Sequence, residues 1–179
     1  MSSPAILIRL MQMEDVEQVV AIDRLSFSLP WPANSYRFEL LENQASRLWV
    51  AECVGDGNPA RIVAMIVVWH IVDEAHIATI AVHPDYRRLG IGKRLLAFTL
   101  KDAVDQGMHS ATLEVRAGNL AAQTMYSQFG FYIAGVRPRY YQDNQEDAML
   151  MSAKLDGRTD WIRSAENTLT LRKEADHES

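Results

Sequence analysis

Two hydrophobic spacings alternate along the chain. Alternating residues or short apolar runs are typical of strands, and recurrence every three or four residues is typical of helices. These patterns predict strands over 5–10, 48–54, 62–72, 76–82, 111–116, 131–141 and 148–155, and helices over 13–27, 35–43, 90–106 and 119–129. The order predicts a mixed α/β domain built around one sheet.

Local breaks in the pattern separate these elements. Proline cannot continue a helix, so Pro30-Trp31-Pro32 predicts a stiff loop between the first two helices, with an exposed tryptophan. The turn-forming segment 55–59 predicts a β-hairpin between its flanking strands. After Leu155 the sequence becomes polar. We therefore expect one domain over 1–155 and a tail, 156–179, that is a loose helix or disordered.

Composition narrows the classes of function. The 179 residues are 48% hydrophobic and 23% charged, which is typical of an ordinary folded domain. Eighteen basic against 23 acidic residues give a net charge of -5, which argues against broad binding to nucleic acid or an anionic membrane. The single cysteine, Cys53, fits a reducing compartment. With no recognisable signal peptide and no apolar run of membrane-spanning length, we expect a cytoplasmic protein.

The segment that joins the strand 76–82 to the long helix carries an anion-binding pattern. A helix start offers unpaired backbone N–H groups, and Gly90 and Gly92 leave them accessible to a phosphate. The basic residues around this turn are Arg87, Arg88, Lys93 and Arg94. Such a pattern alone is more often a solvated, glycine-rich helix start than an anion site. The P-loop and the three-glycine dinucleotide motif are both missing, so ATP and NAD are poor candidates.

Two side chains further along suit proton transfer. Alternation in the strand 113–116 places Glu114 and Arg116 on one face, and Tyr126 lies in the helix that follows. From these patterns alone, Glu114 fits a solvent-facing strand residue equally well. Tyr126 likewise fits a core residue, and Asn119 fits a helix N-cap. Trp31 is equally a partly buried loop anchor. The histidines lack metal-ligand spacing, so we expect no metal site.

Together these motifs resemble the GNAT superfamily of N-acetyltransferases. Arg87-x-x-Gly90-x-Gly92 resembles its acetyl-CoA pyrophosphate loop. The segment 113–119 (Leu-Glu-Val-Arg-Ala-Gly-Asn), followed by Tyr126 and Gly130-Phe131, resembles the RimI-type ribosomal-protein-alanine N-acetyltransferases, and the likeness extends over about residues 5–155. It departs at Gly118, where the family usually has serine. The resemblance implies the GNAT fold, a single, mostly antiparallel sheet with helices on both faces.

The resemblance also implies a role for each matching residue. Glu114 would accept a proton and Tyr126 would donate one. The strand before the loop, matched by Thr79 to Val82, would carry a bulge. Contacts to the co-substrate acetyl-CoA are implied for Ile80, Ala81, Val82, Arg87, Arg88, Leu89, Gly90, Ile91, Gly92, Lys93 and Asn119. Contacts to a peptide are implied for Trp31, Arg137, Tyr140 and Tyr141.

Three functions are therefore considered. The first is acetylation of a protein's N-terminal α-amine, with a ribosomal protein that begins with Ala or a similar small residue as the substrate that the resemblance implies. The second keeps the chemistry but acts on a lysine side chain or a small-molecule amine. The third is a non-catalytic acetyl-CoA-binding or partner-binding module, against which the pair of Glu114 and Tyr126 argues. We expect a monomer or weak oligomer that contacts neither nucleic acid nor membrane directly.

Overall fold

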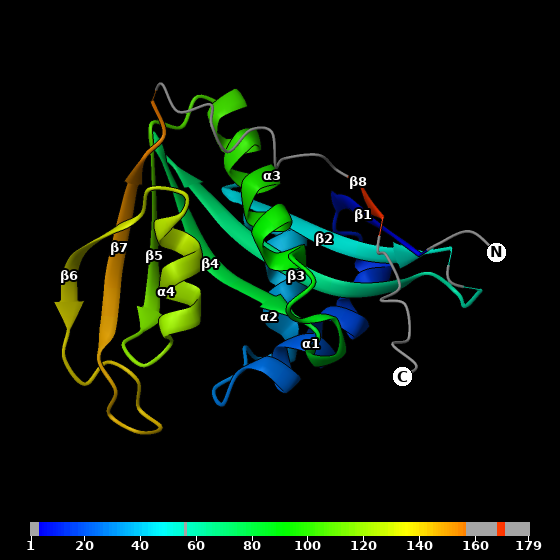
Figure 1. The fold of residues 1–179 in the computed structure, drawn as a ribbon, viewed down its shortest axis with the longest axis horizontal. Coiled ribbons are helices and arrows are strands. Elements are labelled where there is room, and N and C mark those ends of the chain that lie inside the picture. The colour runs from blue at the N-terminus through cyan, green and yellow to red at the C-terminus, as the bar shows by residue number, and fades with distance from the viewer. Residues whose placement is uncertain (1–3, 56, 157–167, 171–179) are drawn as a thin grey trace, which may run out of the picture.

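The computed structural model describes residues 4–55, 57–156 and 168–170. Within these residues one sheet has the strand order β6-β7-β5-β4-β3-β2-β1-β8 (Figure 1). Its strands are β1 (Ala5–Leu10), β2 (Ser46–Val54), β3 (Arg61–Ile71), β4 (Glu74–Val82), β5 (Ser110–Arg116), β6 (Tyr132–Arg137), β7 (Ala148–Lys154) and β8 (Thr168–Thr170). Every neighbouring pair is antiparallel except β4 and β5, which are parallel. The predicted mostly antiparallel sheet is confirmed.

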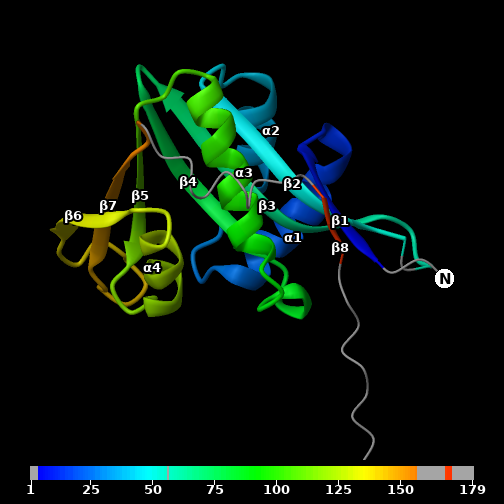
Figure 2. The ribbon, with the colours of Figure 1, turned by 45° about the horizontal axis from the view of Figure 1, so that its top comes forward.

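Helices cover both faces of this sheet. They are α1 (Val16–Ser26), α2 (Ala33–Leu41), α3 (Ile91–Asp105) and α4 (Leu120–Ser127), with short 3-10 turns at η1 (Met13–Asp15) and η2 (Pro84–Tyr86). In Figures 1 and 2, α3 and α4 lie on one face, and α1 and α2 lie on the other. In the described part of the chain, no helix is long and apolar enough to span a membrane.

The two faces hold separate hydrophobic cores because successive strand residues point in opposite directions. In β2, Trp49 and Ala51 pack in the core that includes α3 and α4, whereas Leu48 and Val50 pack in the core that includes α1 and α2. A strand buried on both faces needs a continuous apolar sequence. This explains the unbroken buried run 62–68 in β3.

The parallel pair β4 and β5 comes apart towards its carboxyl end. Pairing extends only to Ile77 and Leu113, after which the two strands diverge (Figures 1 and 2). A bulge lies at this point, because Thr79 pairs with Val67 while Ile77 pairs with Val68, which leaves Ala78 as an extra residue. A bulge bends its strand, and the predicted bulge is therefore confirmed, one residue before Thr79.

Two expectations from the sequence need correction. The strand predicted over 131–141 ends at Arg137, and Tyr140 and Tyr141 lie beyond it in a loop. Arg139 has a φ of 52°, a left-handed conformation that a continuing strand does not allow. In the tail, Thr168–Thr170 pair with β1 as a strand, not as a loose helix or disordered segment. The other tail residues after Asp156 lie outside the described part of the chain.

Candidate active site

A cleft of about 390 Å³ opens where β4 and β5 diverge. It is lined by Ile77–Val82 of β4, Leu113–Arg116 of β5, Asn119, Ala122, Met125 and Tyr126 at α4, Ser26 at the end of α1, Phe27, Leu29 and Trp31 after α1, and Gly92 and Tyr141. Segments far apart in the sequence thus meet around one space. Glu114, Tyr126 and Asn119, each proposed from the sequence, all line it.

The β4 wall offers backbone groups more than side chains. Beyond Ile77, within the described residues, no strand pairs with β4 on its β5 side. The Ala81 side chain is 6% exposed and packs in the core under α1 and α2. Any contact from Ala81 to a molecule in the cleft therefore has to come from its backbone. Ile80 and Val82 are half-buried and also contribute apolar surface.

The turn between η2 and α3 has the backbone geometry of an exposed helix start. Gly90 is the N-cap of α3 and has a φ of 77°, a conformation that glycine adopts without steric cost. Arg88 in this turn and Lys93 in the first turn of α3 are exposed. The first N–H groups of a helix have no partner within it and carry a partial positive charge. Together these features make a setting for a phosphate group.

The side chains of Arg87 and Ile91 are held by contacts within the protein. Arg87 folds back on the protein: its Nε donates to the carbonyl of Val82 at 3.0 Å and its Nη2 donates to the Ser26 hydroxyl at 3.2 Å. It thereby ties the turn to the end of α1. Ile91 is 2% exposed and belongs to the core, so only its backbone is available to a ligand.

Glu114 lies on the cleft wall formed by β5, and its carboxylate already has partners. Its Oε1 is 2.9 Å from Nη1 of Arg137, whose side chain is 53% exposed. A hydrogen bond to Glu114 also raises the pKa of Tyr140. The structure thus brings Arg137 and Tyr140 to the carboxylate, although neither of them lines the cleft itself.

Tyr126 reaches the cleft from α4. It is 6% exposed and packs beside Phe131, with the ring centroids 5.8 Å apart. Burial raises the pKa of its phenol above the ordinary value, so the hydroxyl keeps its proton at neutral and mildly alkaline pH. Tyr126 is therefore both a core residue and a cleft residue that carries a proton.

The arrangement agrees with a comparison of the whole chain with known proteins. The model of the Acetyltransferase (GNAT) family matches residues 16–131. This chain belongs to the GNAT acetyltransferase family. The sequence-based assignment to this superfamily is confirmed.

Individual relatives of this GNAT protein cover most of its length. A Bacillus subtilis protein, whose name assigns ribosomal protein bS18-alanine N-acetyltransferase activity provisionally, is 36% identical over 80% of this chain and 92% of its own. The Escherichia coli protein named ribosomal protein bS18-alanine N-acetyltransferase is 32% identical over 77% of this chain and 90% of its own length. The crystal structure of the E. coli ribosomal-protein-S18-alanine N-acetyltransferase has a TM-score of 0.75 at 27% identity and covers 87% of this chain and 97% of that one.

Two further residues of the GNAT site have structural roles as well. The Asn119 side chain accepts from the N–H of Ala122 at 3.1 Å, so it is the N-cap of α4 while it lines the cleft. The Trp31 ring is stacked between Tyr36 and Trp69, with centroid separations of 5.3 and 6.4 Å, and is half-buried rather than exposed. The backbone N–H of Trp31 donates to the carboxylate of buried Asp23 at 2.7 Å.

Sequence reasoning missed several contributors to the GNAT cleft. Phe27 and Met125 line it, but their hydrophobic character gives no signal that separates them from core residues. Arg116 lines it too, and its position two residues after Glu114 on the same strand face was the available signal. Among the described residues, no group of three or more His, Cys, Asp or Glu side chains is arranged to hold a metal ion.

Proposed function

We propose that this GNAT protein transfers the acetyl group of acetyl-CoA to the N-terminal α-amine of a protein. The substrate we propose is a ribosomal protein whose chain begins with Ala or a similar small residue. The observation that carries the proposal is that Glu114 and Tyr126 line one cleft that also reaches Gly92, in the first turn of α3. The name of the E. coli relative supports the choice of substrate.

The residues of the cleft fit acetyl-CoA, which supplies the thioester-linked acetyl group when bound. The unpaired edge of β4 at Ile80, Ala81 and Val82 offers backbone donors and acceptors to an amide-containing arm. The turn from Arg87 to Lys93 offers the positive helix end and basic side chains to a pyrophosphate. Asn119, at the start of α4, provides a further polar contact.

Glu114 is the proton acceptor in this proposal. A reactive amine must be neutral, and an α-amine has a pKa of about 7.7–8.0, against about 10.4 for a lysine side chain. A carboxylate in the cleft, acting directly or through water, therefore needs only modest basicity to deprotonate an α-amine near neutral pH. This difference favours the α-amine over lysine as the target.

Tyr126 is the proton donor. A thiol with a reference pKa of about 8.5 departs as a thiolate with little assistance, so the phenol mainly neutralises the developing charge and positions the sulfur. The raised pKa of Tyr126, caused by its burial, keeps the proton available throughout the working pH range. Glu114 and Tyr126 approach the cleft from different elements, β5 and α4, which separates the two proton transfers in space.

The peptide would enter between the segment after α1 and the loop after β6. Trp31 lies in the first of these, and Tyr140 and Tyr141 lie in the second. Arg137 and Tyr140 contact Glu114 directly, so they are placed to orient the amine that approaches it. Aromatic side chains with polar groups suit a peptide backbone, because they provide contact area together with hydrogen bonds.

The test is to incubate the protein with acetyl-CoA and a panel of peptides and to locate the acetyl group by fragmentation mass spectrometry. The panel varies the first residue, includes an internal lysine, and repeats each peptide with the α-amine or the lysine blocked. Acetyl on the α-amine, with Ala-first peptides preferred, is expected. Acetyl only on lysine would favour a side-chain acetyltransferase, and acetyl-CoA binding without transfer to any amine would favour a non-catalytic module.

A further inference from the structure

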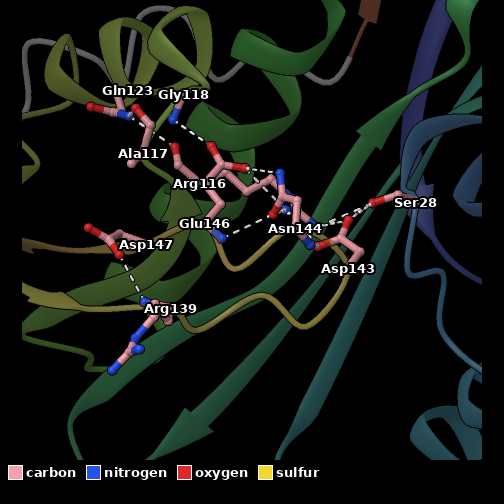
Figure 3. Close-up of polar contacts among 10 residues, drawn as sticks. All are labelled: Ser28, Arg116, Ala117, Gly118, Gln123, Arg139, Asp143, Asn144, Glu146 and Asp147. Carbon is pink, nitrogen blue, oxygen red and sulfur yellow. Dashed lines mark hydrogen bonds and ion pairs between the residues drawn. The ribbon is translucent and has the colours of Figure 1, made fainter.

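Arg116, the last residue of β5, is the centre of a polar cluster beside the cleft (Figure 3). Its Nη1 donates to Asp143, Asn144 and Glu146 at 3.1, 3.2 and 3.1 Å. Its Nη2 donates to Asp143 at 2.9 Å and to the Ser28 hydroxyl at 3.2 Å. All partners except Ser28 lie in one loop, residues 138–147, between β6 and β7. One guanidinium thus binds three side chains of this loop.

Glu146 ties the same loop to the start of α4. Its Oε1 accepts from the backbone N–H of Gly118 at 2.7 Å while its Oε2 faces Arg116. A Cβ atom at position 118 would lie 2.8 Å from that Oε1, closer than real contacts allow, so glycine leaves the space that the carboxylate occupies. The loop is therefore anchored at two points, the end of β5 and the turn before α4.

Asp143 extends the cluster to the opposite side of the cleft. Besides Arg116, it accepts a hydrogen bond from Ser28, which lies between the cleft-lining residues Phe27 and Leu29. Arg116, Asp143 and Ser28 thus connect the two chain segments that flank the proposed path of the peptide (Figure 3).

Arg116 also holds a cleft residue directly. Its guanidinium carbon lies 3.9 Å from the ring centroid of Tyr141, the one residue of this loop found to line the cleft. A cation at this separation is attracted to the face of the ring. The planar, five-donor guanidinium satisfies this stacking and the carboxylates at the same time, which a lysine ammonium cannot do.

We propose that Arg116 is a positioning residue for peptide binding, and this inference rests on the proposed function. It holds loop 138–147 against the segment after α1 and fixes the Tyr141 ring at the cleft before any peptide arrives. Without its charge, the carboxylates of Asp143 and Glu146 repel each other and lose their shared donor. The loop then has to be ordered by the peptide itself, which weakens peptide binding without changing the proton-transfer groups.

The first test compares steady-state kinetics of Arg116→Gln, Arg116→Lys and a matched control, Arg47→Gln. Arg47 also pairs with an aspartate, Asp102 at 2.6 Å, and also lies over an aromatic ring, Trp49 at 5.7 Å, but it does not line the cleft. We expect Arg116→Gln to raise the peptide KM about tenfold, with kcat and the acetyl-CoA KM changed less than about twofold. Arg116→Lys should recover part of the loss. A wild-type peptide KM in Arg116→Gln would overturn the inference.

The second test separates positioning from direct contact with the substrate. Neither Asp143 nor Glu146 lines the cleft, so Asp143→Asn and Glu146→Gln can affect the peptide KM only through the loop. Both should raise it, and hydrogen exchange of residues 138–147 should accelerate in the same variants and in Arg116→Gln. If only Arg116→Gln is impaired while exchange is unchanged, Arg116 contacts the peptide itself and the positioning role is wrong.

The exchange measurement also separates the inference from the proposed function. It needs neither peptide nor turnover, so faster exchange in the Arg116→Gln loop supports the positioning role even if the acceptor is a different amine. A wild-type protein that acetylates no α-amine would refute the proposed function. An active wild type whose Arg116→Gln variant has normal loop exchange and a normal peptide KM would refute the inference alone.

Discussion

Replacing Glu114 with glutamine is the sharpest test of the proposed chemistry. Glutamine keeps the volume and one acceptor oxygen for Arg137 and Tyr140, but it cannot accept the proton of an amine at these pH values. The ion pair that is lost joins a half-exposed arginine to a carboxylate that is 21% exposed, so the free energy of unfolding should fall by less than ~1 kcal/mol. Positioned general bases typically contribute about 10²–10⁴ in rate, and turnover should fall by that factor.

The assay is thiol release at saturating peptide and acetyl-CoA, with acetyl-CoA affinity measured separately by calorimetry. Affinity should stay within about twofold of the wild type, since Glu114 is not among the proposed cofactor contacts. The variant should also regain activity with pH. An α-amine of pKa near 7.8 is about sevenfold more abundant in its neutral form at pH 9 than at pH 7, so kcat/KM of the variant should increase by about that factor.

Glu52→Gln is a matched control for this experiment. Glu52 is a sheet carboxylate that pairs with Arg9 at 3.0 Å and is 18% exposed, close to the value for Glu114, but it does not line the cleft. Its variant should lose a comparable ion pair and keep wild-type turnover. If Glu114→Gln retains turnover within about twofold of the wild type at saturating peptide, Glu114 is not the proton acceptor and the reasoning fails.

Three further predictions follow from individual side chains. Tyr126→Phe keeps the buried ring and should lower kcat at least about tenfold with little change in Tm; unaltered thiol release would rule out its role as proton donor. Arg88→Ala removes an exposed cation and should weaken acetyl-CoA binding about tenfold in calorimetry, a claim that wild-type affinity would contradict. Burial raises the pKa of Asp23 although the hydrogen bond from the Trp31 backbone N–H lowers it, so the folded state binds this proton more tightly than the unfolded chain. The stability of the wild type should therefore fall relative to that of Asp23→Asn as the pH rises from below the ordinary aspartate pKa to above the raised pKa. If the denaturation midpoints of the two proteins change in parallel from about pH 3.5 to 8, this prediction is wrong.

Much of the fold could be predicted from the sequence because its signals are local. Hydrophobic spacing reflects which face of a strand or helix is buried, and this placed β1 at Ala5–Leu10 and α3 within 90–106. The strand at 131–141 was predicted too long because the β-favouring residues Tyr140 and Tyr141 lie in a loop. There, contacts with Glu114 and Arg116 outweigh the local preference.

The sequence by itself determined the candidate residues and the family, and the tertiary structure decided how those residues are combined. Gly90 with its basic neighbours, Glu114 and Tyr126 are recognisable by type and spacing. That Glu114 faces Arg137, that Arg116 joins Asp143 to Ser28, and that Gly118 gives space to Glu146 depend on strand register and loop paths. Ser28 and Asp143 are 115 positions apart, a separation over which hydrophobic periodicity carries no information about contact, because only the assembled sheet and its packed helices bring such residues together.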